Sequence, residues 1–273
     1  MSLINRYYKL LSGYSETPSV DARALLAYVT KTDPCLLWRE LTIEEEEKVL
    51  FCIEERKKGK PVAYITGEKE FMGLTFHVDE NVLIPRPDTE TIVETLIEIL
   101  PQTLPSPTYH ITDLCSGSGC IGISLAHYIK NSLVTMWDIS DGAIEVSKKN
   151  ILRHNLSERV SVNKGDVLRD TYPASDVIVS NPPYIANSVA DTLEVSRFEP
   201  SLALKGGDDG LYFYRTMIPK AYEALNKGGI LAFEIGYDQG EAVKCLMEEY
   251  FTAVTVKKDY AENDRMVYGY KKD

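Results

Sequence analysis

The run Asn181, Pro182, Pro183 and Tyr184 combines residue types that together could hold a reacting nitrogen. It follows the strand-like stretch "SDVIVS", so the Asn181 amide is expected at the end of a strand. An amide carbonyl accepts hydrogen bonds without carrying charge. Pro183 restricts Pro182 to extended backbone, which fixes the direction of the Pro182 carbonyl. Two fixed acceptors can grip one planar NH2 group, and the Tyr184 ring can support it. A rigid Pro-Pro loop with an Asn cap is the alternative interpretation.

A glycine-rich stretch, "DLCSGSGCIG", lies between a predicted strand and a predicted helix. Gly117, Gly119 and Gly122 satisfy the G-x-G-x-x-G pattern, which lets backbone approach a ligand at a helix N-terminus. A tight strand-to-helix turn has the same pattern. Asp138 ends the next predicted strand, where an acid can bind ribose hydroxyls or simply cap a helix. Asp166 follows the third strand, so all these positions face one crevice, which favours a nucleoside cofactor.

The glycine pattern fits both NAD and S-adenosylmethionine, and a dehydrogenase would need NAD. The run from Asn181 to Tyr184 favours S-adenosylmethionine, because an amide or aromatic amine nitrogen is a poor nucleophile that must be oriented. Fixed acceptors supply that orientation. No strong base is required, since the product can lose its proton after methyl transfer.

Residues 1–66 are expected to form a helical domain. The stretch "SVDARALLAYVTKT" has helical spacing, and Thr42 with Glu45 three residues later has the pattern of a capping box. Strand-like residues flank "DEN" at 79–81, which predicts a β-hairpin turning there. Residues 67–86 are interpreted as this hairpin linker between two domains.

Residues 87–273 are expected to form an α/β domain. Helical patterns separate most of seven strand-like stretches: "HITDL", "LVTMWDI", "VSVNKGD", "SDVIVSN", "GILAFEIG", "AVTVKKD" and "MVYGYKK". This alternation predicts a Rossmann-like, doubly wound, seven-stranded sheet. The last two strands have no helix between them, so an antiparallel hairpin is expected at the sheet edge.

Composition limits the partners and the compartment. The 273 residues carry a net charge of −11, which disfavours long nucleic acid as the main partner. The five cysteines form no C-x-x-C pair and have no histidine cluster nearby, so no metal site or disulfide framework is expected. The N-terminus lacks a signal-peptide core, and no stretch reaches transmembrane length. A cytoplasmic location without membrane attachment follows as an expectation.

The chain resembles the HemK/PrmC family of protein-(glutamine-N5) methyltransferases. The resemblance rests on five stretches and runs from about residue 60 to the C-terminus: "PVAYITGEKEFMGLTFHVDENVLIPRPDTE", "DLCSGSGCIGISLA", "VIVSNPPYI", "FEPSLALKGGDDGLYFYR" and "LNKGGILAFEIGYDQG". It implies methylation, with S-adenosylmethionine, of the glutamine in the Gly-Gly-Gln motif of class-1 peptide chain release factors. It also implies that residues 1–66 recognise the substrate and that the enzyme acts in translation termination. A monomer is expected.

The resemblance further implies roles for individual residues. The substrate glutamine would be held by Asn181, Pro182, Pro183 and Tyr184. The cofactor would be bound by Asp113, Cys115, Ser116, Gly117, Ser118, Gly119, Asp138, Asp166, Val167 and Asn181. Arg86 and Glu90 either help close the active site or belong to a helix start after a rigid hinge. Arg265 receives no role.

Three other interpretations remain open at this point. An adenine-N6 methyltransferase acting on nucleic acid can use the same Asn-Pro-Pro-Tyr run, although the acidic charge opposes it. A methyltransferase acting on a ribosomal-protein glutamine also shares the run, but "LIPRPDTE" resembles the release-factor branch. A non-catalytic nucleotide-binding adaptor would not need the run at all.

Overall fold

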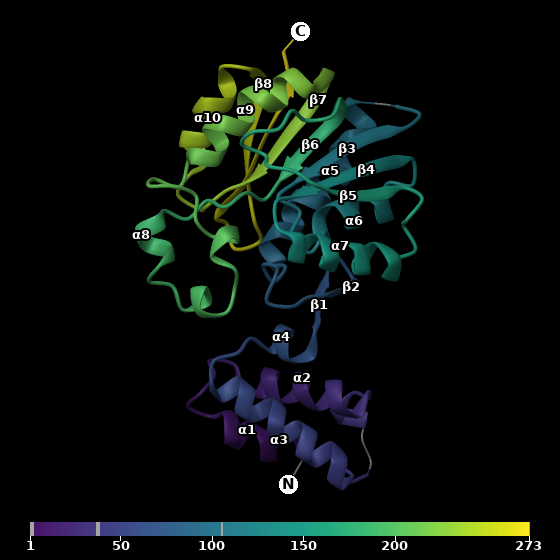
Figure 1. The fold of residues 1–273 in the computed structure, drawn as a ribbon, viewed down its shortest axis with the longest axis vertical. Coiled ribbons are helices and arrows are strands. Elements are labelled where there is room, and N and C mark those ends of the chain that lie inside the picture. Colours follow the sequence, from purple (N-terminus) through teal and green to yellow (C-terminus); the bar gives the residue numbers. More distant parts are fainter. Residues whose placement is uncertain (1–2, 37–38, 105, 273) are drawn as a thin grey trace. The chain divides into compact units, whose positions relative to one another are not determined.

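The chain folds into two compact units, Met1–Glu68 and Lys69–Asp273. The computed structural model describes residues 3–36, 39–104 and 106–272 (Figure 1). The first unit is mainly helical and contains α1 (Leu3–Leu11), α2 (Pro18–Thr30), the 3-10 turn η1 (Pro34–Leu36), α3 (Ile43–Lys57) and α4 (Val62–Thr66). Its core comes from α1, α2 and α3 and comprises Tyr7, Leu11, Ala22, Leu25, Leu26, Val49, Cys52 and Ile53.

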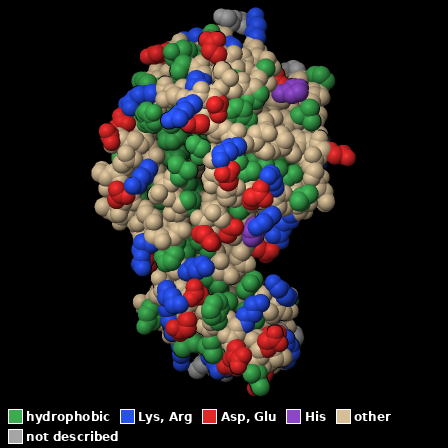
Figure 2. Space-filling view, viewed as in Figure 1, with side chains coloured by type: hydrophobic (Ala, Val, Ile, Leu, Met, Phe, Trp, Pro, Cys, Tyr) green, Lys and Arg blue, Asp and Glu red, His purple; other side chains and the backbone are tan. Residues whose placement is uncertain are grey.

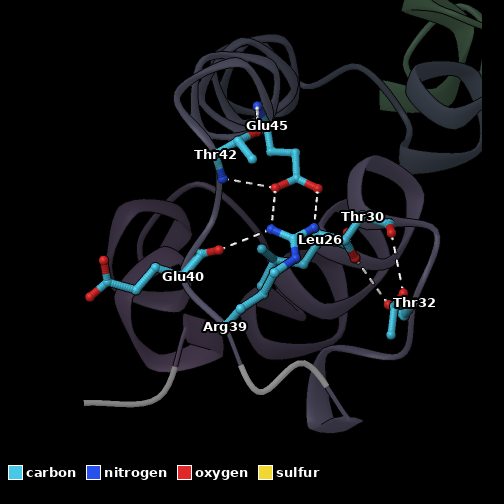
Figure 3. A network of polar contacts seen from close by, with 7 residues as sticks. All are labelled: Leu26, Thr30, Thr32, Arg39, Glu40, Thr42 and Glu45. Atoms are coloured by element: carbon cyan, nitrogen blue, oxygen red, sulfur yellow. Dashed lines mark hydrogen bonds and ion pairs between the residues drawn. The ribbon is translucent and has the colours of Figure 1, made fainter.

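The predicted capping box at the start of α3 is confirmed (Figure 3). The Thr42 hydroxyl accepts a hydrogen bond from the Glu45 backbone N–H at 3.2 Å, and the Glu45 carboxylate accepts one from the Thr42 N–H at 2.8 Å. Both carboxylate oxygens also accept from the Arg39 guanidinium at 2.6 Å. The pKa of Glu45 is lowered to about 2, mainly by Arg39. These contacts fix the point at which the helix begins.

The predicted hairpin exists, but the turn predicted at 79–81 was wrong. Strands β1 (Glu68–Phe71) and β2 (Leu74–His77) are joined by a two-residue turn at Met72 and Gly73. Both turn residues have positive φ, 51° and 67°, which is the backbone that a tight hairpin requires. The three residues 79–81 form a separate turn, in which Asp79 accepts from the Asn81 N–H at 3.0 Å. The chain after that turn makes no strand and continues to the cavity described below.

The second unit is built on the expected seven-stranded sheet, in the order β5-β4-β3-β6-β7-β9-β8. Its strands are β3 (Tyr109–Leu114), β4 (Ser132–Asp138), β5 (Val160–Lys164), β6 (Ser175–Ser180), β7 (Leu225–Glu234), β8 (Phe251–Lys258) and β9 (Asp264–Lys271). The strands β5, β4, β3, β6 and β7 pair in parallel. The last two strands form an antiparallel hairpin, as predicted, and β9 inserts between β7 and β8.

Helices cover both faces of this sheet (Figure 1). The helices that pack on it are α5 (Glu90–Thr103), α6 (Cys120–Tyr128), α7 (Asp141–Arg153), α9 (Tyr212–Ala224) and α10 (Gly240–Glu248). The shorter elements η2 (Pro87–Thr89), α8 (Asn187–Ala190), η3 (Glu194–Arg197) and η4 (Ser201–Ala203) lie in the connecting segments. Val177 and Val179 pack in a core with α5, α6 and α7, whereas Ile178 packs in a second core with α9 and α10. This alternation follows from the two-residue period of a strand.

The surface carries both signs of charge. On the face in view in Figure 2, Lys and Arg side chains are interspersed with Asp and Glu side chains. Among the helices of the described residues, none has the length and apolar character needed to span a lipid bilayer.

Candidate active site

A cavity of about 220 Å³ opens at the carboxyl ends of the central parallel strands. Nine residues predicted from the sequence line it: Cys115, Ser116, Gly117, Ser118, Asp138, Asp166, Val167, Asn181 and Pro183. The strand order explains this convergence, because β4, β3 and β6 are neighbours and their carboxyl ends meet at one edge. Four other predicted residues, Asp113, Gly119, Pro182 and Tyr184, do not line the cavity, although Pro182 lies in the chain between the lining residues Asn181 and Pro183.

The glycine-rich loop after β3 has an unusual backbone. Cys115, Gly117 and Gly119 have positive φ angles of 59°, 54° and 80°. Gly119 precedes α6, and a Cβ added there would lie 3.0 Å from both Ile123 Cδ1 and Met136 Cε. Glycine at this position can adopt the positive φ angle, and because it has no Cβ it also allows α6 to pack closely on β4.

Helix α7 holds the same loop from the other side. The Ser147 hydroxyl donates to the Gly117 carbonyl at 2.8 Å, and the Asn150 amide donates to the Ser118 carbonyl at 2.9 Å. Both side chains are buried, and their three-residue spacing places them on one face of the helix. Asn150 also accepts from the His77 N–H at 2.7 Å and donates to the His77 carbonyl at 3.0 Å. One buried amide thus joins β2 to the loop.

Two buried polar atoms at the loop have no hydrogen-bond partner among the described residues, Asp113 Oδ1 and Ser116 Oγ. The other Asp113 oxygen accepts from the Gly122 N–H at 2.9 Å. Burial raises the pKa of Asp113 to about 8, and the nearby Asp138 carboxylate contributes to the shift. A buried polar atom without a partner is costly, and Ser116 lines the cavity, so its hydroxyl indicates that a polar ligand completes the site.

Asp138 and Asp166 present carboxylates to the cavity. Asp138 Oδ1 accepts from the Ser140 N–H at 2.9 Å, and burial raises its pKa despite that bond. Asp166 Oδ1 accepts from the Leu168 N–H at 2.9 Å. Each oxygen keeps a further lone pair, so both acids can accept ribose hydroxyls or other donors. The acids around the loop also suit a ligand that carries positive charge.

Two thiols line the cavity as well. Burial raises the pKa of Cys115 well above its usual range and that of Cys120 to about 12. All five cysteines are free. Both cavity cysteines are therefore thiols at neutral pH, and a thiol is a much weaker nucleophile than a thiolate.

The Asn-Pro-Pro-Tyr run begins where β6 ends. Asn181 and Pro183 line the cavity, and the Asn181 side chain makes no hydrogen bond to another described residue. The Tyr184 hydroxyl points elsewhere and donates to Oε1 of Glu234 at 3.2 Å. The structure therefore brings the asparagine amide to the cavity that the glycine-rich loop lines but directs the tyrosine hydroxyl into the protein.

Sequence reasoning missed several residues of the site. Glu199 is buried, and its carboxylate accepts from Arg86 at 2.5 Å and from the Ile84 N–H at 3.3 Å. This ion pair joins the segment before α5 to the segment after the Asn-Pro-Pro-Tyr run, and both segments line the cavity. No local pattern could reveal a pair that is 113 positions apart. Phe213, at the start of α9, also lines the cavity and lay within a stretch given no role.

Comparisons with known proteins agree with this architecture. Residues 2–67 match the PrmC N-terminal domain, and residues 89–198 match the methyltransferase small domain. A solved methyltransferase structure from Pyrococcus furiosus aligns with a TM-score of 0.52 and 17% identity, covering 85% of this chain and 100% of that one. This last likeness shows the fold alone.

Fold and cavity together define an S-adenosylmethionine-dependent methyltransferase, with S-adenosylmethionine as its cofactor. The release factor glutamine methyltransferase of Clostridium botulinum is 42% identical over 276 residues, covering 97% of this chain and 96% of the relative. That of Clostridium acetobutylicum is 41% identical, with the same coverage. The chain belongs to the release factor glutamine methyltransferase family.

Proposed function

We propose that this protein transfers a methyl group from S-adenosylmethionine to the side-chain amide nitrogen (N5) of the glutamine in the Gly-Gly-Gln motif of class-1 peptide chain release factors. The modification modulates translation termination. One observation carries the proposal: Asn181 and Pro183 line the same cavity as the cofactor loop at 115–118. The relatives that match nearly the whole chain are release factor glutamine methyltransferases, and this supports the same substrate.

The chain's own residues account for catalysis by positioning. S-adenosylmethionine, when bound, supplies an electrophilic methyl group. The Asn181 side-chain carbonyl and the Pro182 backbone carbonyl accept the two N–H groups of the substrate amide. Holding both N–H groups directs the nitrogen toward the cofactor loop, and orientation of this kind accounts for a large part of a two-reactant barrier. No base is needed before transfer, since the product nitrogen loses its proton afterwards.

Recognition of the folded release factor is assigned to the helical residues 1–66. The hairpin region at 67–86 links them to the catalytic residues 87–273. The match of residues 2–67 to the PrmC N-terminal domain supports this division. Helix α3 exposes Ile43, Leu50 and Phe51, which lie on one face and offer an apolar contact surface. The enzyme acts as a monomer in the cytoplasm, where release factors work.

The test is mass spectrometry of unmethylated release factor incubated with the protein and S-adenosylmethionine. The Gly-Gly-Gln peptide should gain the mass of one methylene unit. Asn181→Ala should slow this gain by about a hundredfold or more, because an orienting acceptor is lost. Asn163→Ala, an exposed asparagine on β5, is the matched control and should leave the rate unchanged.

The same assay distinguishes the other substrates. Ribosomal protein and adenine-containing nucleic acid are incubated in parallel, and S-adenosylmethionine binding is measured by calorimetry. Methylation of either of these in place of release factor would refute the substrate assignment. Binding of the cofactor without transfer to release factor would do the same.

A further inference from the structure

Glu234 is a buried carboxylate directly behind the Asn-Pro-Pro-Tyr run. It is the last residue of β7, and its residue exposure is 2%. β7 lies beside β6, with Phe233 opposite Ser180, so the two strands end together. Glu234 Oε1 accepts from the Tyr184 hydroxyl at 3.2 Å, whereas Oε2 has no hydrogen-bond partner among the described residues. A buried acid is costly to retain, so its contact with Tyr184 calls for a functional reason.

Tyr184 is also held through its backbone. The Gln239 side-chain amide donates to the Tyr184 carbonyl at 3.0 Å, and its carbonyl accepts from the Gly236 N–H at 2.9 Å. Gly206 packs on the same backbone, since an added Cβ would lie 2.7 Å from Tyr184 Cα. The stretch from Glu234 to Gln239 therefore fixes the tyrosine at two points, its hydroxyl and its carbonyl.

This double attachment restrains the residues that precede Tyr184. Proline fixes φ, and a residue before proline is confined to extended backbone. Pro182 and Pro183 therefore leave little rotational freedom between Tyr184 and Asn181. At the other end, the Ser180 hydroxyl donates to the Leu114 carbonyl at 2.6 Å and holds the end of β6. Asn181 lies between two anchored points.

We propose that Glu234 is a positioning residue for methyl transfer, which holds the Tyr184 hydroxyl and thereby fixes the Asn181 and Pro182 acceptors in the orientation that the substrate amide requires. This inference rests on the proposed function. It gives the stretch "FEIGYDQG" a role that is separate from cofactor binding, because neither Glu234 nor Gln239 lines the cavity.

The surroundings of Glu234 predict how pH affects this contact. Burial raises the pKa of Glu234 to about 7. The groups that face it are Thr89 and Asp88 before α5, Arg265 on β9 and Tyr184, and only Asp88 raises the pKa further. A second tyrosine contacts the Glu234 backbone, where the Tyr214 hydroxyl donates to the Glu234 carbonyl at 2.8 Å. The charged carboxylate is a stronger acceptor than the neutral acid. The restraint on Tyr184 therefore weakens as pH falls through about 7.

The test measures kcat for release-factor methylation, at saturating cofactor and release factor, in four variants and the wild type. Glu234→Leu and Tyr184→Phe each remove the contact and should lower kcat about tenfold to a hundredfold. Glu234→Gln keeps a neutral acceptor and should lose only about threefold to tenfold. The double variant Y184F/E234L should lose no more than the worse single variant, because one contact is removed only once. The dissociation constant for S-adenosylmethionine should change less than about twofold in all of them.

A pH series separates positioning from a merely structural role. Wild-type kcat should fall as pH drops through about 7, whereas Glu234→Gln should stay near the wild-type low-pH value throughout. If Glu234→Leu does not fold, two milder variants still test whether the contact between Glu234 and Tyr184 matters for kcat. These are Glu234→Gln, which keeps the shape of the side chain, and Tyr184→Phe, which removes only the hydroxyl. Two results would overturn the role of Glu234 and leave the proposed function standing. One is that the losses of the two single variants add in the double variant, and the other is that Glu234→Leu has the same kcat as the wild type. A wild-type protein that does not methylate release factor would overturn the proposed function as well.

Discussion

The Gly117 backbone N–H donates to Oδ2 of Asp138 at 2.8 Å, so the glycine-rich loop is attached to the end of the neighbouring strand. The other carboxylate oxygen accepts from the Ser140 N–H, just before α7. A single acid thus holds two backbone segments of the cavity and still faces the cavity with its remaining lone pairs. Both roles depend on the negative charge of the carboxylate.

Replacing Asp138 with Asn should weaken S-adenosylmethionine binding by about tenfold to a hundredfold, because hydrogen bonds to a charged acceptor are lost or become neutral. Calorimetry on the purified variant measures this. Asp141→Asn is the matched control, since this acid is exposed, begins α7 and pairs with Lys164 at 2.7 Å. Its affinity should equal that of wild type. If the Asp138→Asn variant binds S-adenosylmethionine as tightly as the wild type does, Asp138 does not belong to the cofactor site.

Asp113 should make the cofactor-free protein less stable as pH rises. Its pKa is raised from 3.8 to about 8, so the folded state binds this proton more tightly than the unfolded state. The unfolded acid ionises first, and stability therefore falls with rising pH between about pH 4 and about pH 8. Asp113→Asn keeps an acceptor for the Gly122 N–H but cannot ionise.

Thermal unfolding at a series of pH values without cofactor checks this prediction. The melting temperature of Asp113→Asn should rise relative to wild type as pH increases from about 5 to about 8. Asp141→Asn, with an exposed side chain, should give a curve parallel to wild type. A curve for Asp113→Asn that also stays parallel would show that Asp113 is already ionised in the folded state.

The sequence was sufficient to predict which strand ends line one cavity. Asp138 ends a predicted strand, and Asp166 and Asn181 lie at or just after the ends of two others. Parallel strands bring their carboxyl ends to one edge whatever the details of packing. Chain order and strand neighbours therefore placed these three side chains. The alternating pattern of Val177, Ile178 and Val179 likewise required two covered faces of the sheet.

The rest depended on contacts that leave no local pattern. Glu234 and Tyr184 are 50 positions apart, and only the pairing of β6 with β7 brings them together. The hairpin turn was predicted at the polar residues 79–81, because "DEN" has typical turn residues. The chain turns instead at Met72 and Gly73, where the methionine adopts a positive φ that its residue type does not favour. Tertiary context decided both cases.

Breaking the ion pair between Arg86 and Glu199 should destabilise the catalytic unit. Arg86→Met leaves the Glu199 carboxylate, whose side chain is 1% exposed, without its charge partner. The expected loss is about 1–3 kcal/mol, below that of a fully buried pair because the Arg86 side chain is 39% exposed. Thermal or urea unfolding measures the change.

Adding Glu199→Gln to Arg86→Met should recover most of this loss. The glutamine still accepts from the Ile84 N–H but carries no charge to compensate. The matched control is Arg215→Met, which breaks an exposed pair with Asp209 of the same 2.5 Å length and should leave the unfolding midpoint unchanged. An Arg86→Met midpoint equal to wild type would show that the Arg86 charge does not stabilise the fold.

The exposed apolar face of α3 should matter for whole release factor and not for a short peptide. Ile43 is 82% exposed and Phe51 is 65% exposed, and their eight-residue spacing places them on one side of the helix. Ile43→Ser combined with Phe51→Ser should lower kcat/KM on folded release factor about tenfold, by removing apolar contact area. Turnover of a Gly-Gly-Gln peptide should stay at the wild-type level, because the catalytic cavity is intact.

Val20→Ser, on α2 and also 65% exposed, serves as the control and should leave both rates unchanged. Equal losses on peptide and protein would assign these residues to folding instead of recognition.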